Sequence, residues 1–323
     1  MPELREMLES RQVAIYFAAV AAAAVLALAW PGAASLEPVI TPLLALMLFA
    51  TFLQMPMTEL PRAFANLRFL AALLVSNFLV VPVLVAGLIH LLPEDMPMLR
   101  LGVLLVLLCP CVDYVVTFSG IGRADSRALL AATPVLLLAQ MAMLPVTLTL
   151  LLGREAQAAI ALAPFLDAFA TQIVAPLALA ALVQGAARRH RPAERIVSSL
   201  GLLAVPATAL VLFTVVAAML PRIAPAAGDA LMALPIYGSF AALAPLLGWA
   251  VARLLRLEAM AGRAVAFSSA TRNSLVILPL ALAIPGGIPV LPAVIVTQTL
   301  VELAASLAYM RLMPSLGRRG RSG

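Results

Sequence analysis

The residues best suited to chemistry lie together in the segment CPCVDYVVTF, at residues 109–118. Cys109 and Cys111 are the two cysteines of the chain, and Asp113 follows two positions later. A thiolate ligates soft metal or metalloid centres, and a carboxylate can take up and release a proton. Because Pro110 removes a helical N–H group and crowds the preceding turn, the segment predicts a helix break at these side chains.

A second polar cluster, SSATRNSLV, occupies residues 268–276 and contains Arg272, Asn273 and Ser274. The last apolar segment of the chain carries two internal polar residues, Gln298 and Glu302. If the segments that carry Asp113 and Arg272 cross, these two charges can pair. Such a pair has two interpretations, a structural ion pair or a part of a functional site.

The elements that position these residues are membrane helices. Of the 323 residues, 64% are hydrophobic and 11% are charged, and the mean hydropathy is +1.08. A soluble domain carries roughly twice that charged fraction. Apolar blocks of about 20 residues are long enough to cross a bilayer as helices, and helices satisfy their own backbone groups in lipid. We therefore predict an all-α polytopic membrane protein in the plasma membrane.

Ten spans are predicted, at approximately 13–30, 39–56, 67–92, 99–120, 128–152, 159–187, 196–220, 229–252, 263–284 and 289–312. All 21 basic residues are arginines. Most of them lie at the two ends of the chain and in alternate loops, which is the positive-inside pattern and predicts that both termini are cytoplasmic. The net charge of +6 is therefore a topology signal, and no nucleic-acid partner is expected.

The longest loop, RRHRPAERI near residues 188–196, is expected to be cytoplasmic and to separate residues 1–187 from residues 197–323 within one integral transporter unit. The first segment holds the first five-helix repeat and the first helix of the second repeat. Five spans per repeat give the two repeats opposite orientations in the membrane, which is an inverted repeat. The fourth span of each repeat is the polar, interrupted one, so spans 4 and 9 are predicted to be broken helices that cross.

Broken helices at matching positions of two repeats are the sequence pattern of a transport site. An ionisable residue at membrane depth is a functional hypothesis by default, whereas a buried ion pair stabilises a fold weakly. We therefore interpret Asp113, Arg272 and Glu302 as site residues. Cys111 has an alternative interpretation as a small packing residue. The sequence shows no phosphate-binding loop, no metal-ligand spacing and no nucleophile–base pair. We therefore expect neither an enzyme nor a cofactor.

The chain resembles the bile acid:sodium symporter superfamily in its five-plus-five plan and its polar breaks in spans 4 and 9. Within it, PCVDYVVTFSGIGRADSRALL is similar to the fourth-span segment of arsenite-efflux permeases. Cys111 and Phe118 fall on that family's essential cysteine and its aromatic residue. Glu302, in VIVTQTLVELAASLAY, takes the place of an important glutamate, and Asn273 matches an asparagine of the superfamily. The Ser-Asn pair and the Glu/Gln expected of sodium-coupled members are replaced, and Arg272 puts a fixed cation close to the expected sodium position.

The resemblance implies a secondary carrier that exports an arsenite-like trivalent metalloid in exchange for protons. Cys111, with Cys109 as a second candidate ligand, would contact the metalloid, and Asp113 and Glu302 would carry protons. Asn273, Ser274 and Gln298 complete the expected translocation site. The alternative is a sodium-independent carrier of a small organic anion, in which Arg272 and the positive ends of the broken helices hold a carboxylate. A channel or membrane sensor is a third class, which an inverted repeat disfavours.

Overall fold

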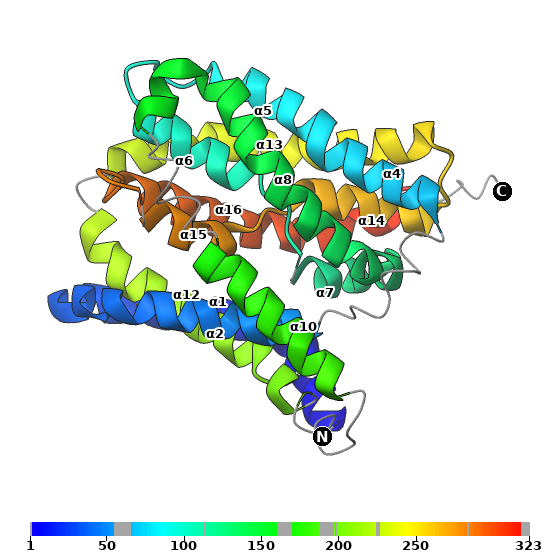
Figure 1. Cartoon of the computed structure of the whole chain (residues 1–323), viewed down its shortest axis with the longest axis horizontal. Helices are drawn as coiled ribbons and strands as arrows, with labels where there is room; N and C mark the ends of the chain where they lie inside the picture. The colour runs from blue at the N-terminus through cyan, green and yellow to red at the C-terminus, as the bar shows by residue number, and fades with distance from the viewer. Residues whose placement is uncertain are drawn as a thin grey trace. The chain divides into compact units, whose positions relative to one another are not determined.

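The computed structural model describes residues 2–54, 66–112, 114–159, 170–187, 197, 199–223, 227–282 and 284–317. Within these ranges every regular element is helical, and the single β-type contact is an isolated bridge between Pro110 and Arg272. Figure 1 shows the helices with the labels used below. The all-helical prediction is therefore confirmed for the described part of the chain.

Seven helices among the described residues are long and apolar enough to cross a membrane. They are Arg11–Ala29, Gly32–Gln54, Leu67–Ile89, Ser126–Leu151, Ser199–Pro221, Gly228–Leu254 and Val290–Ser315. Each coincides with one of the ten predicted spans. Large apolar side chains such as those of Leu28, Leu150 and Leu182 are more than two-thirds exposed, as expected where lipid rather than water covers the surface. The chain is a multi-pass membrane protein.

The other three predicted spans differ from a simple helix. Span 4 consists of α6 (Pro97–Leu107) and α7 (Tyr114–Ile121), and span 9 consists of α14 (Ala259–Ala270) and α15 (Ser274–Leu282). The structure thus has both predicted breaks. Span 6 lies partly outside the described residues, which include η4 (Ala170–Val174) and α10 (Ala175–Ala187) of it. Asp113 and the loop at 188–196 also lie outside the described residues.

The chain divides into two compact units. Unit 1 comprises Met1–Met55, Ile160–Asp229 and Leu278–Val296. Its long helices are α1 (Pro2–Ala29), α2 (Glu37–Gln54), α10 and α12 (Ala204–Ile223), with η1 (Pro31–Leu36) between the first two. Helix α12 packs against α1 and α2, and α10 packs against α2 (Figure 1). The amide of Gln184 donates to the carbonyls of Phe52 and Leu53, which satisfies acceptors at the C-terminal end of α2.

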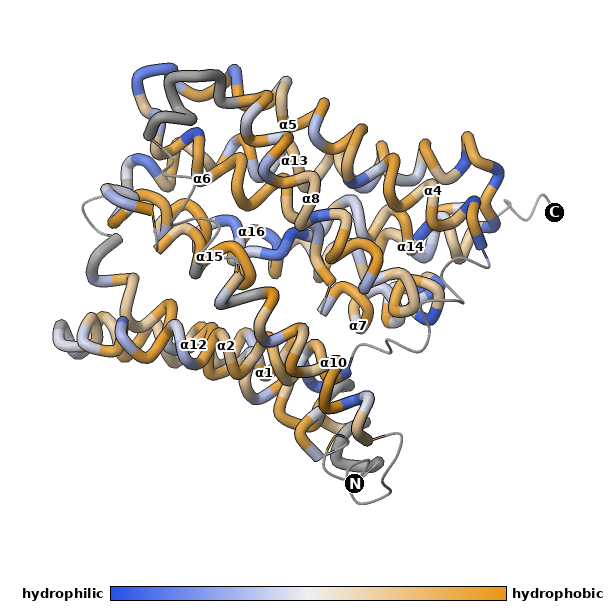
Figure 2. The backbone as a smooth tube through the Cα atoms, viewed as in Figure 1, coloured by the Kyte–Doolittle hydropathy of each residue, from blue (hydrophilic) through white to orange (hydrophobic). Residues whose placement is uncertain are grey.

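Unit 2 comprises Pro56–Ala159, Ala230–Ile277 and Thr297–Gly323, and it holds all of the described candidate site residues. It contains α4 (Leu67–Val75), the π-helical turn η3 (Ser76–Val80), α5 (Val81–Ile89), α6, α7, α8 (Ser126–Ala159), most of α13 (Ala227–Leu254), α14, the part of α16 (Val290–Leu312) from Thr297 onward, and η6 (Met313–Ser315). Helix α14 packs against α4, α7 and α8. In Figure 2 the helices are mostly apolar, while a polar stretch runs beside α16.

Candidate functional site

The break between α6 and α7 follows from its proline. Helix α6 ends at Leu107, and the N–H of Cys109 already bonds to the carbonyl of Val106, a tight final turn. Pro110 has no N–H to donate and disfavours helical geometry in the residue before it. The described residues from Cys109 to Val112 are consequently non-helical, and α7 begins at Tyr114.

The break between α14 and α15 has no proline. Helix α14 ends at Ala270, and Thr271 takes an extended conformation with φ −106° and ψ 137°. Asn273 precedes α15, and its Oδ1 accepts a hydrogen bond from the N–H of Val276 at 3.4 Å. Asparagine is among the preferred residues at a helix N-cap. The polar cluster therefore both ends one helix and starts the next.

The two unwound segments meet and complete each other's hydrogen bonds. The N–H of Cys111 donates to the carbonyl of Thr271 at 3.1 Å, and the N–H of Asn273 donates to the carbonyl of Cys109 at 2.8 Å. These two bonds flank the antiparallel bridge between Pro110 and Arg272. Backbone groups released by a break in a membrane helix must find partners in the protein. The prediction that the breaks lie close together is confirmed for their described residues.

The side chain of Arg272 lies in a cage of oxygen atoms and is fully buried. Nη2 donates to the carbonyls of Ser268 and Ser269, both at 2.7 Å, and to Oδ1 of Asn77 at 2.9 Å. Nη1 donates to the carbonyl of Leu107 at 3.3 Å. Three of these four acceptors are backbone carbonyls at the C-terminal ends of α14 and α6, where the helix dipole favours a cation.

Asn77 is held so that its oxygen faces Arg272. Its Nδ2 donates to the carbonyl of Leu73 and to Oγ of Ser268, both at 3.0 Å. Asn77 lies in η3, a π-helical turn within an otherwise apolar span, and π turns are frequent at functional sites. On another side, the guanidinium carbon of Arg272 lies 5.3 Å from the ring centroid of Phe240, a cation–π distance. The sequence interpretation missed Asn77, although a polar pair, Ser76-Asn77, interrupts the span.

Glu302 accepts three hydrogen bonds and is buried. Its Oε2 accepts from the backbone N–H of Arg272 at 2.7 Å and from Nε2 of Gln298 at 2.6 Å. Its Oε1 accepts from the hydroxyl of Tyr114 at 2.5 Å. Oγ of Ser274 donates to Oε1 of Gln298 at 2.5 Å, which fixes the orientation of that amide. The predicted residues Arg272, Ser274, Gln298 and Glu302 therefore form one network, which Tyr114 joins without having been predicted.

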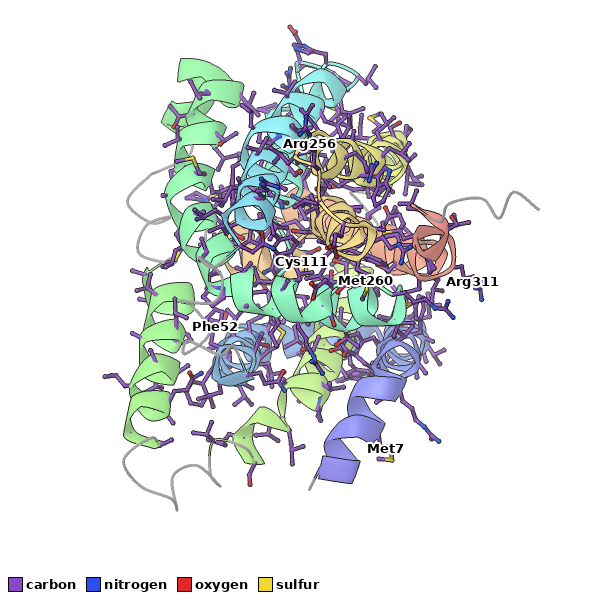
Figure 3. The ribbon with its side chains drawn as sticks, turned by 90° about the vertical axis from the view of Figure 1, so that its right-hand side faces the viewer. Met7, Phe52, Cys111, Arg256, Met260 and Arg311 are labelled. Carbon is purple, nitrogen blue, oxygen red and sulfur yellow. The ribbon has the colours of Figure 1, made fainter. Side chains whose placement is uncertain are left out.

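Both cysteines lie at the crossing and are thiols that are fully buried. Figure 3 shows Cys111 among the helices. The backbone groups of both residues are used in the bonds between the two breaks. Asp113 lies outside the described residues, so its predicted pairing with Arg272 stays a prediction. Among the described residues, no group of three or more His, Cys, Asp and Glu side chains is arranged to hold a metal ion.

Two donors at the crossing are buried and lack a hydrogen-bond partner among the described residues, namely Nε of Arg272 and Nδ2 of Asn273. An unpaired buried donor costs roughly 1–3 kcal/mol, so such groups call for an explanation. Arg272 and Asn273 are adjacent in the extended segment between α14 and α15. An acceptor-bearing ligand at the crossing would satisfy either donor.

This arrangement defines a class of protein: a multi-pass membrane protein whose two interrupted helices meet around buried charges. A profile of the Sodium Bile acid symporter family matches residues 41–224, which is more than half of the chain and includes the α6–α7 break. The chain belongs to this family, which is a family of transporters. A comparison with curated proteins finds no significant match. The matched range ends before Arg272 and Glu302, so the family match does not extend to these two residues.

Proposed function

We propose that the protein is a secondary active transporter coupled to protons rather than to sodium. The observation that carries this proposal is the oxygen cage around Arg272. Carbonyl oxygens at unwound helix ends are typical ligands for a coupling sodium ion in transporters. Here the guanidinium of Arg272 occupies such a set of oxygens. Because a guanidinium stays protonated at physiological pH, it replaces a bound cation and cannot itself be the transported one.

Glu302 is the proposed proton carrier among the described residues. It is buried and ionisable, and it accepts hydrogen bonds from the backbone N–H of Arg272, the amide of Gln298 and the hydroxyl of Tyr114. A carboxylate enclosed in this way changes its charge when it binds a proton, so its contacts differ between two states. Asp113 is a second candidate carrier. Proton binding and release on opposite sides of the membrane would supply the driving force.

The proposed substrate is an arsenite-like trivalent metalloid, exported in exchange for protons. Cys111 lies at the crossing with its backbone bonded to Thr271, next to the fixed charge of Arg272. Sulfur is the protein ligand that suits such soft centres. Cys109 is two residues away and could act as a second ligand. Both thiols are buried in this conformation, so binding requires a state in which the crossing opens to one side of the membrane.

We further propose that the chain is built from ten transmembrane helices in two inverted repeats of five. The α6–α7 and α14–α15 pairs would occupy equivalent positions in the two repeats. Residues 188–196 would form the cytoplasmic loop between 1–187 and 197–323, and both termini would be cytoplasmic in the plasma membrane. This symmetry supports alternating access, in which two related conformations open to opposite sides.

A carrier of a small organic anion is the second candidate function. The two buried donors without partners, Nε of Arg272 and Nδ2 of Asn273, favour it. A carboxylate has acceptors for both kinds of donor and would also meet the N-terminal end of α15. In this alternative Cys111 serves for packing, and proton coupling through Glu302 is retained.

Uptake into inside-out vesicles tests the proposal. Vesicles that contain the full-length protein are given arsenite under an imposed proton gradient, with sodium or with choline at equal ionic strength. We expect uptake that requires the proton gradient and that is the same in both salts. Uptake that requires sodium would refute proton coupling. Proton-driven uptake of small carboxylates without uptake of arsenite would establish the second candidate instead.

A further inference from the structure

The two oxygens of Glu302 have different surroundings. Oε2 receives hydrogen bonds from the backbone N–H of Arg272 and from the amide of Gln298, whereas Oε1 contacts the hydroxyl of Tyr114. The N–H groups at Oε2 can only donate, and the hydroxyl of Ser274 holds the amide of Gln298 in this orientation. A proton that binds to the carboxylate therefore goes to Oε1.

The hydroxyl of Tyr114 has one proton, and at least two acceptors among the described residues lie within hydrogen-bond distance of it. One is Oε1 of Glu302 at 2.5 Å, and a second is the backbone carbonyl of Arg272 at 3.2 Å. When Glu302 is ionised, the hydroxyl of Tyr114 points this proton at Oε1 and donates a short charge-assisted hydrogen bond. With Oε1 protonated, the new O–H donates to the phenolic oxygen, and the phenolic proton turns to the carbonyl of Arg272.

We propose that Tyr114 is a positioning residue that transmits the protonation of Glu302 to the break between α14 and α15. This inference rests on the proposed function, in which Glu302 carries the coupling proton. The proton arrives from the aqueous phase and binds Oε1 to form a carboxylic acid. The phenolic proton stays on Tyr114 and changes only its acceptor, so no charge other than that of Glu302 is altered.

The carbonyl of Arg272 makes the two states different for a substrate. It lies between the two half-helices and bonds to Tyr114. When Glu302 is protonated, the carbonyl of Arg272 accepts the full hydrogen bond from the hydroxyl of Tyr114. When Glu302 is ionised, this carbonyl can accept from another donor. A trivalent metalloid hydroxide carries O–H groups that can donate to it. Proton binding would then weaken substrate binding, because the hydroxyl of Tyr114 and the substrate compete for the same carbonyl, and such antagonism favours an exchange of proton for substrate.

Among the described residues, the further ionisable neighbours of Glu302 and Arg272 are Tyr309 on α16 and the two cysteines of the α6–α7 break. Two other side chains that contact Arg272, those of Asn77 of η3 and Phe240 of α13, carry no charge. The hydroxyl of Tyr309 donates to the carbonyl of Ala241 at 2.7 Å. Tyr309→Phe therefore removes a nearby tyrosine hydroxyl outside the Tyr114 contact and is the matched control.

Infrared difference spectroscopy of the full-length protein in liposomes tests the inference without any substrate. Acidification should produce a carboxylic-acid carbonyl band that Glu302→Gln abolishes. We expect Tyr114→Phe to move this band, because the acid loses its acceptor, and Tyr309→Phe to leave it in place. In vesicles, the pH of half-maximal transport should move by about one unit in Tyr114→Phe, the size expected for one hydrogen bond to a charged group.

The outcomes separate the two proposals. If no acid band depends on Glu302, Glu302 is not the proton carrier and the inference fails, while proton coupling is then left to Asp113 and is tested by the vesicle experiment. If the band depends on Glu302 but is the same in Tyr114→Phe and wild type, Tyr114 is not the transmitting residue and proton coupling stands. Should Tyr114→Phe fold poorly, the wild-type protein with isotope-labelled tyrosine gives the answer. Its tyrosine C–O band must change together with the Glu302 band and stay unchanged in Glu302→Gln.

Discussion

The guanidinium of Arg272 is bonded to the amide oxygen of Asn77 at 2.9 Å, although the two residues are 195 positions apart in the sequence. Among the described acceptors of this guanidinium, Asn77 is the one side chain, since the other three are backbone carbonyls. It therefore provides the means to alter the cage by mutation without touching the charge itself.

Asn77→Ala should lower the free energy of unfolding by about 1–3 kcal/mol, because it removes one acceptor of a buried cation and the partner of Ser268. Thermal unfolding in detergent measures the effect. Ser269→Ala is the control, since its hydroxyl bonds within α14 to the carbonyl of Val265 and only its carbonyl contacts Arg272. Equal losses in the two variants would contradict the assigned role of Asn77.

Arg272→Ala should convert the cage into a sodium-sensitive site. Without the guanidinium, no cation occupies the four oxygens, which belong to Leu107, Ser268, Ser269 and Asn77. Oxygens of this kind coordinate sodium in transporters. We expect sodium to raise the unfolding temperature of this variant above its value in choline at equal ionic strength. The wild type should unfold at the same temperature in both salts. Equal stabilisation of both proteins by sodium would contradict the conclusion that the guanidinium of Arg272 fills the oxygen cage of the wild type.

Arg272→Gln should severely impair transport, since the fixed charge is lost and Glu302 is left without its cationic neighbour. Leaving a buried charge uncompensated typically costs about 3–5 kcal/mol. The double variant Arg272→Gln/Glu302→Gln should regain stability while remaining inactive, because neither charge is then buried alone. Unfolding and vesicle transport measured on the same preparations test this. A double variant less stable than either single one would show that the two residues act independently.

Cys111→Ser should abolish arsenite transport and leave carboxylate transport, if present, nearly unchanged. A hydroxyl replaces the thiol with little change in volume, so the effect reports sulfur chemistry rather than packing. Cys109→Ser provides the matched comparison, because Cys109 is equally buried and takes part in the same crossing. Arsenite transport by Cys111→Ser at the wild-type rate would exclude Cys111 as a ligand.

Reporter fusions test the proposed topology. Fusions after residues 190 and 318 should report the cytoplasm, and a fusion after residue 225 should report the external side, because arginines gather in the loops at the first two points. A periplasmic reading at residue 190 would refute the arrangement of two inverted repeats.

The breaks in spans 4 and 9 could be predicted because their causes are local. Pro110 cannot continue a helix hydrogen-bond ladder, and the run from Ser268 to Ser274 is polar within an apolar region. The prediction that they meet followed from their matching places in the two halves of the chain. Glu302 and Gln298 could be singled out because polar groups are rare at membrane depth.

The partners of these residues could not be predicted for an equally physical reason. Arg272 bonds mainly to backbone carbonyls, and since every residue has a carbonyl, such acceptors leave no trace in a sequence. Tyr114 lies at the start of an apolar half-helix, where an aromatic residue is ordinarily a packing residue. Its hydroxyl reaches Arg272, 158 positions away in the sequence, and Glu302, 188 positions away, because the two breaks come together.

The shared hydrogen bonds of the two breaks also constrain how the chain is made. When α6 and α7 leave the ribosome, the carbonyl of Cys109 and the N–H of Cys111 lack the partners Asn273 and Thr271 that they have in the folded chain, because those residues have yet to be synthesised. Exposing those groups to hydrocarbon is costly. The first interrupted span must therefore wait at the insertion machinery, or in water, until α14 arrives. When synthesis is stopped before residue 259, the segment that contains residues 109–112 should be extractable from the membrane. When synthesis is stopped after residue 282, the same segment should stay in the membrane.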